Sequence, residues 1–160
     1  MAEVALNDAT IAETTANNHI TYESKDYIGE SSPYCVQWNP ITGACIATNT
    51  DPMYDWKEHK TSAKVKGKAI ATVTNVKFNG KSPVVMGDKT TESDTYTIPS
   101  GGRYKSGAHT SAQGSVATGN NSKVFVNGKS VAINGSKVTT HAKSSSTING
   151  GVSSTVKIGS

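Results

Sequence analysis

Asn79-Gly80-Lys81-Ser82 returns unchanged as Asn127-Gly128-Lys129-Ser130, and each copy directly follows a run of alternating apolar and polar residues. A third, shorter copy, Thr155-Val156-Lys157-Ile158-Gly159, lacks the tetrapeptide but keeps the order of apolar, polar and apolar residues before its glycine. Asn-Gly supplies the positive φ angles that a type I′ hairpin turn requires, so each full copy predicts a strand that turns back on itself. The chain is therefore expected to be built from repeated β-hairpins.

The composition favours a thin, strand-rich body. The chain has 160 residues, of which 34% are hydrophobic and only 6% aromatic. Serine, threonine, glycine and asparagine dominate its second half, and they suit short strands and tight turns better than helices. No run of about 20 apolar residues is present, so no segment is expected to span a bilayer.

The spacing of the repeats indicates one insertion. Val126 and Ile158 are 158 − 126 = 32 positions apart, whereas Phe78 and Val126 are 126 − 78 = 48 apart. The difference of 16 is the length of residues 92–107, which contain Pro99 and two adjacent glycines. Three units of about 32 residues, one of them with an inserted loop, are thus expected to pack around a common axis.

The same spacing divides the chain into two parts. Residues 1–58 are interpreted as an irregular N-terminal part that carries most of the aromatic residues and completes the fold. Residues 59–160 form the repeat region, with the inserted loop at 92–107. Both parts are expected to belong to one compact all-β domain.

Three histidines share nearly the same phase of the repeat. His59, His109 and His141 precede the glycine of their repeat by 21, 19 and 18 residues, respectively. Equivalent positions of three units converge on a pseudo-threefold axis, so the three imidazoles are predicted to form a structural zinc site. A thiolate completes a tetrahedron, and Cys35 and Cys45 are the candidates for that fourth ligand.

Simpler roles for these residues stay open. Histidines in turns rich in serine and threonine are often only solvated or hydrogen-bonded, and His19, which has no counterpart in the repeat, is expected to have such a role. The two cysteines are ten residues apart and can instead close a disulfide loop or remain buried thiols. The first residues lack the features of a secretory signal, so synthesis in the cytoplasm is expected and the disulfide is less favoured.

Charge is unevenly distributed along the chain. Residues 1–60 hold 3 Lys and 9 acids, which gives −6, and residues 61–160 hold 13 Lys or Arg and 3 acids, which gives +10. Lysines scattered singly along strands form solvated faces, and no basic and aromatic cluster predicts nucleic-acid binding. No nucleophile or paired-carboxylate motif is present, so the chain is not expected to be an enzyme.

The sequence GSVATGNNSKVFVNGKSVAINGSKVTTHAKSSSTINGGVSSTVKIGS resembles the PAAR-repeat proteins that tip contractile injection machines. The resemblance covers about residues 107–160 and, more weakly, residues 59–93, where VKFNGKSPVVMGDKTTES is similar to the same unit. The chain departs from the family pattern at Ser130, where proline is usual, and at residues 134–137, where Gly-Asp is common. It therefore resembles a PAAR-like branch of the family.

The resemblance implies a small cone of β-hairpins that caps a trimeric β-helical spike of type VI secretion systems, contractile phage tails or extracellular contractile particles. Such a tip helps to puncture the target membrane and can carry effectors. Zinc held by three histidines and one cysteine near the vertex is typical of the family, and His59, His109, His141 and either Cys35 or Cys45 match those positions.

The alternative function is an adhesion or carbohydrate-binding module. It would use Trp38, Tyr54 and Trp56 of the N-terminal part as stacking residues for sugars.

Overall fold

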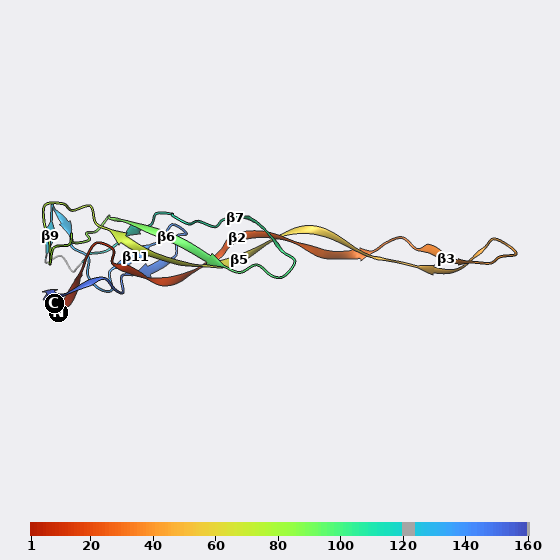
Figure 1. Ribbon diagram of the computed structural model, residues 1–160, viewed down its shortest axis with the longest axis horizontal. Helices are drawn as coiled ribbons and strands as arrows, with labels where there is room; N and C mark the ends of the chain where they lie inside the picture. The colour runs from red at the N-terminus through yellow and green to blue at the C-terminus, as the bar shows by residue number, and fades with distance from the viewer. Residues whose placement is uncertain (120–123, 160) are drawn as a thin grey trace.

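The molecule has two dissimilar ends, a broad body and a long, narrow arm (Figure 1). The computed structural model describes residues 1–119 and 124–159. Every regular element among them is a β-strand, which confirms the expected all-β fold. Within these two ranges, no helix is long and apolar enough to cross a membrane.

Short strands build the body, and two long strands connect it to the arm. The strands are β1 (Ala2–Ala5), β2 (Thr10–Glu30), β3 (Tyr34–Trp38), β4 (Cys45–Asn49), β5 (Pro52–Ile70), β6 (Lys89–Tyr96), β7 (Arg103–Ser106), β8 (Ser115–Val116), β9 (Phe125–Val126), β10 (Lys129–Ser130), β11 (Lys137–Thr139), β12 (Ser145–Thr147) and β13 (Val152–Ile158). The antiparallel pair β2 and β5 runs out of the body, and residues 21–60 of this pair and its turn are here called the arm.

The main sheet of the body curls back on itself. Its strand order is β12-β11-β8-β6-β5-β2-β7. The first strand of this order approaches the start of β2, where the Ser146 hydroxyl donates to the Ala12 carbonyl at 2.6 Å and Ile148 bridges Ile11. The sheet therefore forms a half-barrel. Small and branched apolar side chains fill it: Ala5, Ala9, Ile11, Ala69, Val84, Val116, Ala132, Val138 and Ile148.

A cycle of backbone hydrogen bonds joins three segments at the bottom of the half-barrel. The Ala5 N–H donates to the Ala132 carbonyl at 2.9 Å, the Ala132 N–H to Val84 at 2.8 Å, and the Val84 N–H to Ala5 at 2.9 Å. All three residues are fully buried. This backbone ring arranges the segments around one axis, as the repeat predicted.

Equivalent contacts surround the backbone ring. A second set of N–H to carbonyl bonds of 2.8–2.9 Å joins neighbouring segments: Asn7 to Ser82, Met86 to Ser130, and Asn134 to Glu3. Below the ring lies a second apolar cluster, formed by Val4, Leu6, Val73, Val85, Val126, Val131 and Ile158. This cluster and the hairpin turns around it form the blunt end of the body, here called the base.

The two Asn-Gly pairs form the predicted hairpin turns. Asn79 and Asn127 have φ angles of 51° and 52°, and Gly80 and Gly128 have φ angles of 78° and 76°. All four angles have the sign that a type I′ turn requires.

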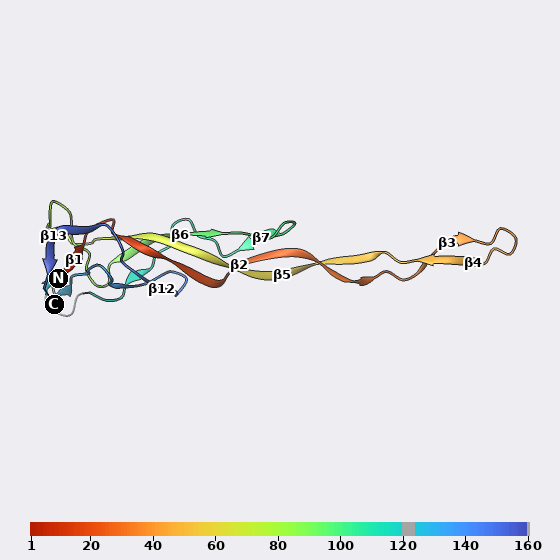
Figure 2. The same ribbon diagram turned by 90° about the horizontal axis from the view of Figure 1, so that it is seen from below.

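The third hairpin is assembled from the two ends of the chain. β13 pairs with β1, with Ile158 opposite Ala2, and both termini lie at the base (Figure 2). The N-terminal strand therefore completes the repeat unit that the sequence placed at the C-terminus alone.

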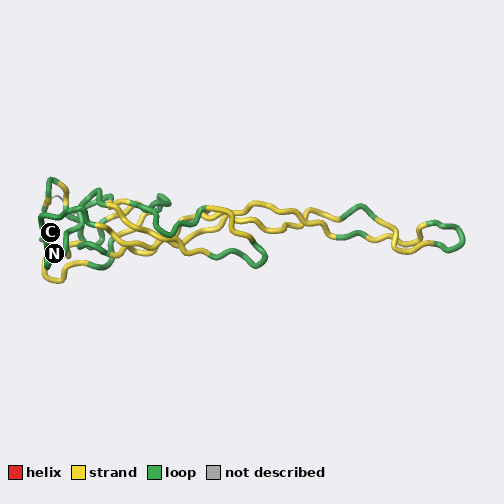
Figure 3. The backbone as a smooth tube through the Cα atoms, turned by 45° about the horizontal axis from the view of Figure 1, so that its top comes forward, coloured by secondary structure: helices red, strands yellow, loops and turns green. Residues whose placement is uncertain are grey.

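The N-terminal part is regular, contrary to the expectation for residues 1–58. Two regular strands, β2 and most of the first half of β5, occupy much of this range, and strands predominate along the arm (Figure 3). The arm is a two-stranded ribbon without a buried face, so its side chains do not show the alternation of apolar and polar residues that marks a half-buried strand. That lack of alternation explains the incorrect interpretation.

The expected inserted loop at residues 92–107 is also only partly a loop. Residues 89–96 form β6, which pairs with β5, and residues 103–106 form β7, which pairs with β2. The inward-facing positions of β6 hold the polar side chains Thr90 and Glu92, both buried, so hydrophobic periodicity gave no sign of a strand there.

A disulfide closes the far end of the arm. β3 and β4 pair with each other, and Cys35 and Cys45 are joined across them. Two-stranded ribbons are marginally stable by themselves in water, so a covalent link near the turn holds the strands together where they are farthest from the body.

The positive φ angle of Asn127 provides a test of the turn. In Asn127→Ala, alanine must adopt the left-handed conformation and has no polar side chain to compensate for it. The substitution is therefore expected to lower the free energy of unfolding by roughly 1–2 kcal/mol. Asn127→Gly loses the same side-chain hydrogen bonds to Asn75 but adopts this φ angle freely. Urea denaturation should therefore show Asn127→Ala to be less stable than Asn127→Gly. Equal stability of the two variants would contradict the turn assignment.

Candidate metal centre

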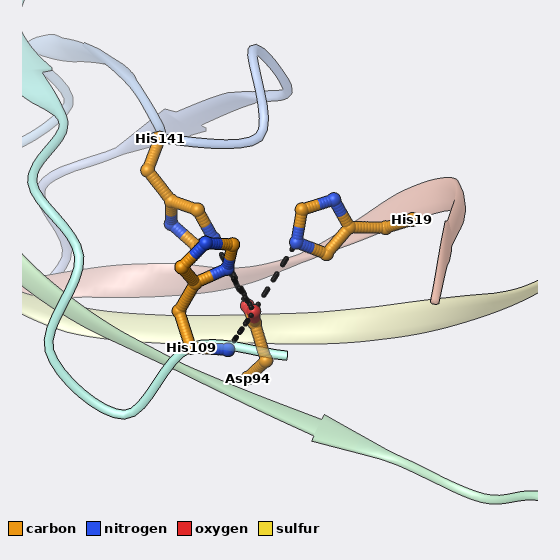
Figure 4. Close-up of side chains that lie close together, drawn as sticks. All are labelled: His19, Asp94, His109 and His141. Atoms are coloured by element: carbon orange, nitrogen blue, oxygen red, sulfur yellow. Dashed lines mark hydrogen bonds and ion pairs between the residues drawn. The ribbon is translucent and has the colours of Figure 1, made fainter. Parts of the chain in front are cut away.

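Four side chains converge where the body narrows into the arm: His19, Asp94, His109 and His141 (Figure 4). Three of them lie on or just after strands that start near the backbone ring and run in the same direction, away from the base. His19 is on β2, Asp94 is on β6, and His141 follows β11 by two residues. The side chains of these segments meet at one place, where their ligand atoms lie within 4.8 Å of one another.

A bulge in β2 positions His19. The pairing of β2 with β5 shifts between Ala16, which lies opposite Ala63, and Ile20, which lies opposite Thr61. Three residues of β2 thus face a single residue of β5, and Asn18 takes a left-handed conformation with φ of 53°. Bulges turn side chains away from the regular pleat, and this one brings His19 toward β6.

A close backbone approach positions His109. Gly107 has φ of 107°, and a Cβ on it would lie 2.2 Å from the carbonyl oxygen of His19. Only glycine permits this contact, which lets the segment after β7 pass directly over the bulge. The His109 backbone then pairs with Asp94, whose N–H donates to the His109 carbonyl at 2.9 Å.

The three imidazoles surround one carboxylate oxygen. Asp94 Oδ2 lies 3.2 Å from His19 Nε2, 3.2 Å from His109 Nδ1 and 3.3 Å from His141 Nε2. It also accepts the backbone N–H of His109 at 2.9 Å. The Asp94 side chain is fully buried, and its second oxygen, Oδ1, makes no hydrogen bond.

These distances fit a tetrahedral metal ion. Four ligands at bonds of about 2.0–2.1 Å, the usual length for imidazole nitrogen and carboxylate oxygen, are separated from one another by roughly 3.3–3.4 Å. The three nitrogen-to-oxygen distances of 3.2–3.3 Å match the edges of such a tetrahedron. All four ligand atoms lie within 4.8 Å of one another, so the cluster can hold a metal ion after small adjustments.

A buried glutamate fixes the orientation of His141. Glu92 Oε2 accepts the His141 backbone N–H at 2.8 Å and lies 2.7 Å from His141 Nδ1. The Glu92 side chain is fully buried, and its other oxygen accepts the Thr90 hydroxyl. A carboxylate that holds one nitrogen of a histidine makes the other nitrogen a better metal ligand.

A metal cation would fit between His141 and Asp94 in one tautomer of His141. When Nδ1 of a neutral His141 donates its proton to Glu92, the lone pair of Nε2 points at the Asp94 carboxylate, 3.3 Å from Oδ2. Two acceptors at that distance repel each other unless a proton or a metal cation lies between them. A divalent cation at this position would also compensate the buried Asp94 carboxylate.

The environment of Asp94 favours its ionised form. Burial raises the pKa of this carboxyl, but the hydrogen bond from the His109 N–H and the charges of His141 and His19 outweigh burial, and the pKa falls below its ordinary value of 3.8. Asp94 is therefore ionised over the whole physiological pH range, as a metal ligand must be.

Of the five residues proposed as ligands from the sequence, the structure brings only His109 and His141 together. His59 lies on the arm, where its Nε2 is 2.8 Å from Asp26 Oδ2 and its ring contacts Tyr22. Cys35 and Cys45 form the disulfide in the arm, so neither has a thiolate to offer. The candidate ligand set is therefore different from the expected one: it contains His19 and Asp94 in place of His59 and a cysteine.

Two sequence signals point to the missed ligands. Asn17 and Asn18 directly precede His19, and asparagine is the residue other than glycine that most readily adopts positive φ, so the pair marks a bulge or turn. Residues 61–160 contain only three acids, Asp88, Glu92 and Asp94, and all three lie within seven residues of one another. This clustering in a region otherwise without acids indicates a site. The first two are almost fully buried residues, and the side chain of Asp94 is fully buried.

The comparisons with known proteins add no identification. No family model, no curated protein sequence and no solved structure matches this chain.

Histidine substitutions test the metal centre. His141→Ala should abolish stoichiometric binding of a divalent transition metal, whereas His59→Ala should bind it as the wild type does, because His59 lies outside the cluster. Bound metal at 1,000 times its dissociation constant stabilises the fold by about 4 kcal/mol, which corresponds to a melting temperature roughly 10 °C higher. Elemental analysis and melting with and without a chelator measure both effects. Loss of metal in His59→Ala but not in His141→Ala would refute the cluster.

Acid sensitivity tests the charge state of Asp94 in the metal-free protein. Since the folded pKa lies below the ordinary value of 3.8, its contribution to stability is complete above pH 3.8 and is lost as the pH falls through the folded pKa. The free energy of unfolding of the wild type should therefore decrease more steeply below pH 3.8 than that of Asp94→Asn. Parallel curves for the two proteins would show that folding does not lower the pKa of this carboxyl.

Proposed function

We propose that this protein is the non-enzymatic tip of a contractile injection machine. Its base caps a trimeric β-helical spike, and its arm points away from the spike toward the target. The observation that carries this proposal is the backbone ring with its equivalent contacts, because a base with three similar segments around one axis can meet three identical chains. The resemblance of residues 107–160 to PAAR-repeat proteins agrees with this role.

The surface of the base is suited to such a partner. Apolar side chains that are only partly buried pack against the lower cluster, among them Val76, Phe78, Val124, Ile133 and Val156. Phe125 of β9 is 52% exposed at the same end of the molecule. Burial of such side chains against the end of a spike would stabilise the complex by about 25 cal/mol for each Å² of apolar surface.

The metal centre has a mechanical purpose in this proposal. We assign zinc to it, because nitrogen and oxygen donors at tetrahedral spacing suit this ion. The ligands come from β2, β6, the segment after β7 and the segment after β11. A metal ion bonded to all four segments would keep the root of the arm together under an axial load without any catalytic role.

The stacking role of the alternative function, a carbohydrate-binding module, is less well supported. The ring face of Trp56 is covered by the Arg103 guanidinium, whose carbon lies 4.0 Å from the ring centroid. Tyr54 packs edge-to-face on Tyr27, with centroids 6.0 Å apart. The rings of both aromatic residues are thus already in contact with other side chains of the protein.

Complex formation with a spike tests the proposal. The purified protein, mixed with the trimeric β-helical spike encoded near it, should form a complex with one copy per three spike chains, measured by light scattering after size-exclusion chromatography. Phe125→Asp should weaken this complex at least tenfold, because the substitution places a charge in the base interface. Tyr54→Asp is a matched control on the arm, since Tyr54 is 57% exposed and Phe125 is 52% exposed. A complex that is lost with Tyr54→Asp and retained with Phe125→Asp would contradict the proposed orientation, and absence of any complex would contradict the function.

A further inference from the structure

The far end of the arm carries no charge. Residues 31–50, here called the tip, contain no Asp, Glu, Lys or Arg, although the chain has 28 such residues in its other 140 positions. Glu30 and Asp51 border the tip on its two strands. A charge-free segment of this length at the most exposed end of a molecule is unusual, because exposed turns are normally the most polar parts of a chain.

Large apolar side chains project from the tip. Ile41, in the turn, is 91% exposed and Trp38 is 61% exposed. Val36 and Ile46 are also more than half exposed. Exposed apolar side chains that gather in one region, rather than lying scattered over a surface, mark a site of contact with another molecule or a membrane.

The backbone of the turn satisfies its own hydrogen bonds. Asn39 is the centre of this network: its N–H donates to the Ala44 carbonyl, its carbonyl accepts the Gly43 N–H, and its side-chain oxygen accepts two further N–H groups, those of Ile41 and Thr42. The Ala44 N–H donates to the Thr42 hydroxyl at 3.4 Å, and residue 40 is a proline without an N–H. Every N–H group from residue 39 to residue 44 is therefore bonded within the turn.

Internal bonding of this kind is what a segment requires to leave water. An unsatisfied N–H group costs several kcal/mol in a lipid environment, where no water replaces the missing partner. The disulfide between Cys35 and Cys45 holds the two strands together and leaves no free thiol.

We propose that the tip inserts into the interfacial region of a lipid bilayer. Trp38 and Tyr34 suit the boundary between headgroups and acyl chains, where amphipathic aromatic side chains are enriched, and Ile41 reaches deepest. The outer edges of the two-stranded ribbon have unpaired backbone groups, so the tip enters the interface and does not span the bilayer. Because no charged side chain takes part, the tip binds zwitterionic lipid. This inference needs only the tip and a bilayer, so it stands independently of the proposed spike complex.

Vesicles of phosphatidylcholine test the inference. The full-length protein should partition onto them, and the binding should persist at about 1 M NaCl, where the Debye length is roughly 3 Å and electrostatic attraction is screened. Lipids with brominated acyl chains should quench Trp38 emission, measured in Trp56→Phe, and should leave Trp56 emission, measured in Trp38→Phe, nearly unchanged. Replacing Trp38 and Ile41 together by Ser should reduce the partition coefficient at least tenfold.

A control at the other end of the molecule separates the tip from general hydrophobicity. Phe125→Ser removes a half-exposed aromatic side chain from the base, and it should leave partitioning unchanged. The inference is overturned when the wild type does not bind phosphatidylcholine vesicles, when Phe125→Ser causes the same loss as the tip variant, or when binding requires anionic lipid and disappears in salt. The circular dichroism spectrum and melting temperature of the tip variant should equal those of the wild type, because both replaced side chains are exposed.

Discussion

The backbone ring of Ala5, Val84 and Ala132 is the constraint on which the rest of the structure depends. Each residue of the ring donates to the next and accepts from the previous one, so no segment can shift without breaking two hydrogen bonds in a fully buried place. The ring separates the core of the half-barrel from the apolar cluster of the base. It also sets the starting points of the strands that lead to the candidate metal centre. The ring therefore sets the strands that carry His19, Asp94 and His141, and local features such as the bulge before His19 place the side chains.

The features that could be predicted from the sequence are those that depend on neighbouring residues. Asn79-Gly80 and Asn127-Gly128 determine their turns by local backbone preference, and the positive φ angles confirm them. The third unit could not be located in this way, because its two strands come from opposite ends of the chain and are joined only by the pairing of β1 with β13. Likewise, the arm shows no alternation of apolar and polar residues, since a two-stranded ribbon has no core to face.

The candidate site was predictable in part for the same reason. The phase of the repeat identified His109 and His141, but it also selected His59. His59 has a similar position in the repeat, yet it lies in the part of β5 that belongs to the arm. His19 depends on a bulge, and Asp94 depends on a strand whose inward positions are polar, so neither follows the repeat. The three acids of residues 61–160 entered the sequence analysis only through the net charge. Their burial gives them a further meaning, because an ionised carboxylate is retained in a core only where cations or donors compensate it.

The placement of the stabilising devices follows from the shape of the molecule. A sideways force on the end of a long arm produces its largest bending moment at the root. There the sheet gains β6 and β7 beside β2 and β5, and the four side chains of the candidate metal centre converge. The disulfide protects the free end, where no other strand supports the ribbon. Between these two points the arm depends on cross-strand pairs, in which Tyr22 lies opposite His59 and Tyr27 opposite Tyr54. His59 thus has a structural role that requires no metal. Its ring packs on Tyr22 of the opposite strand, and its Nε2 contacts the Asp26 carboxylate at 2.8 Å, between the candidate metal centre and the disulfide.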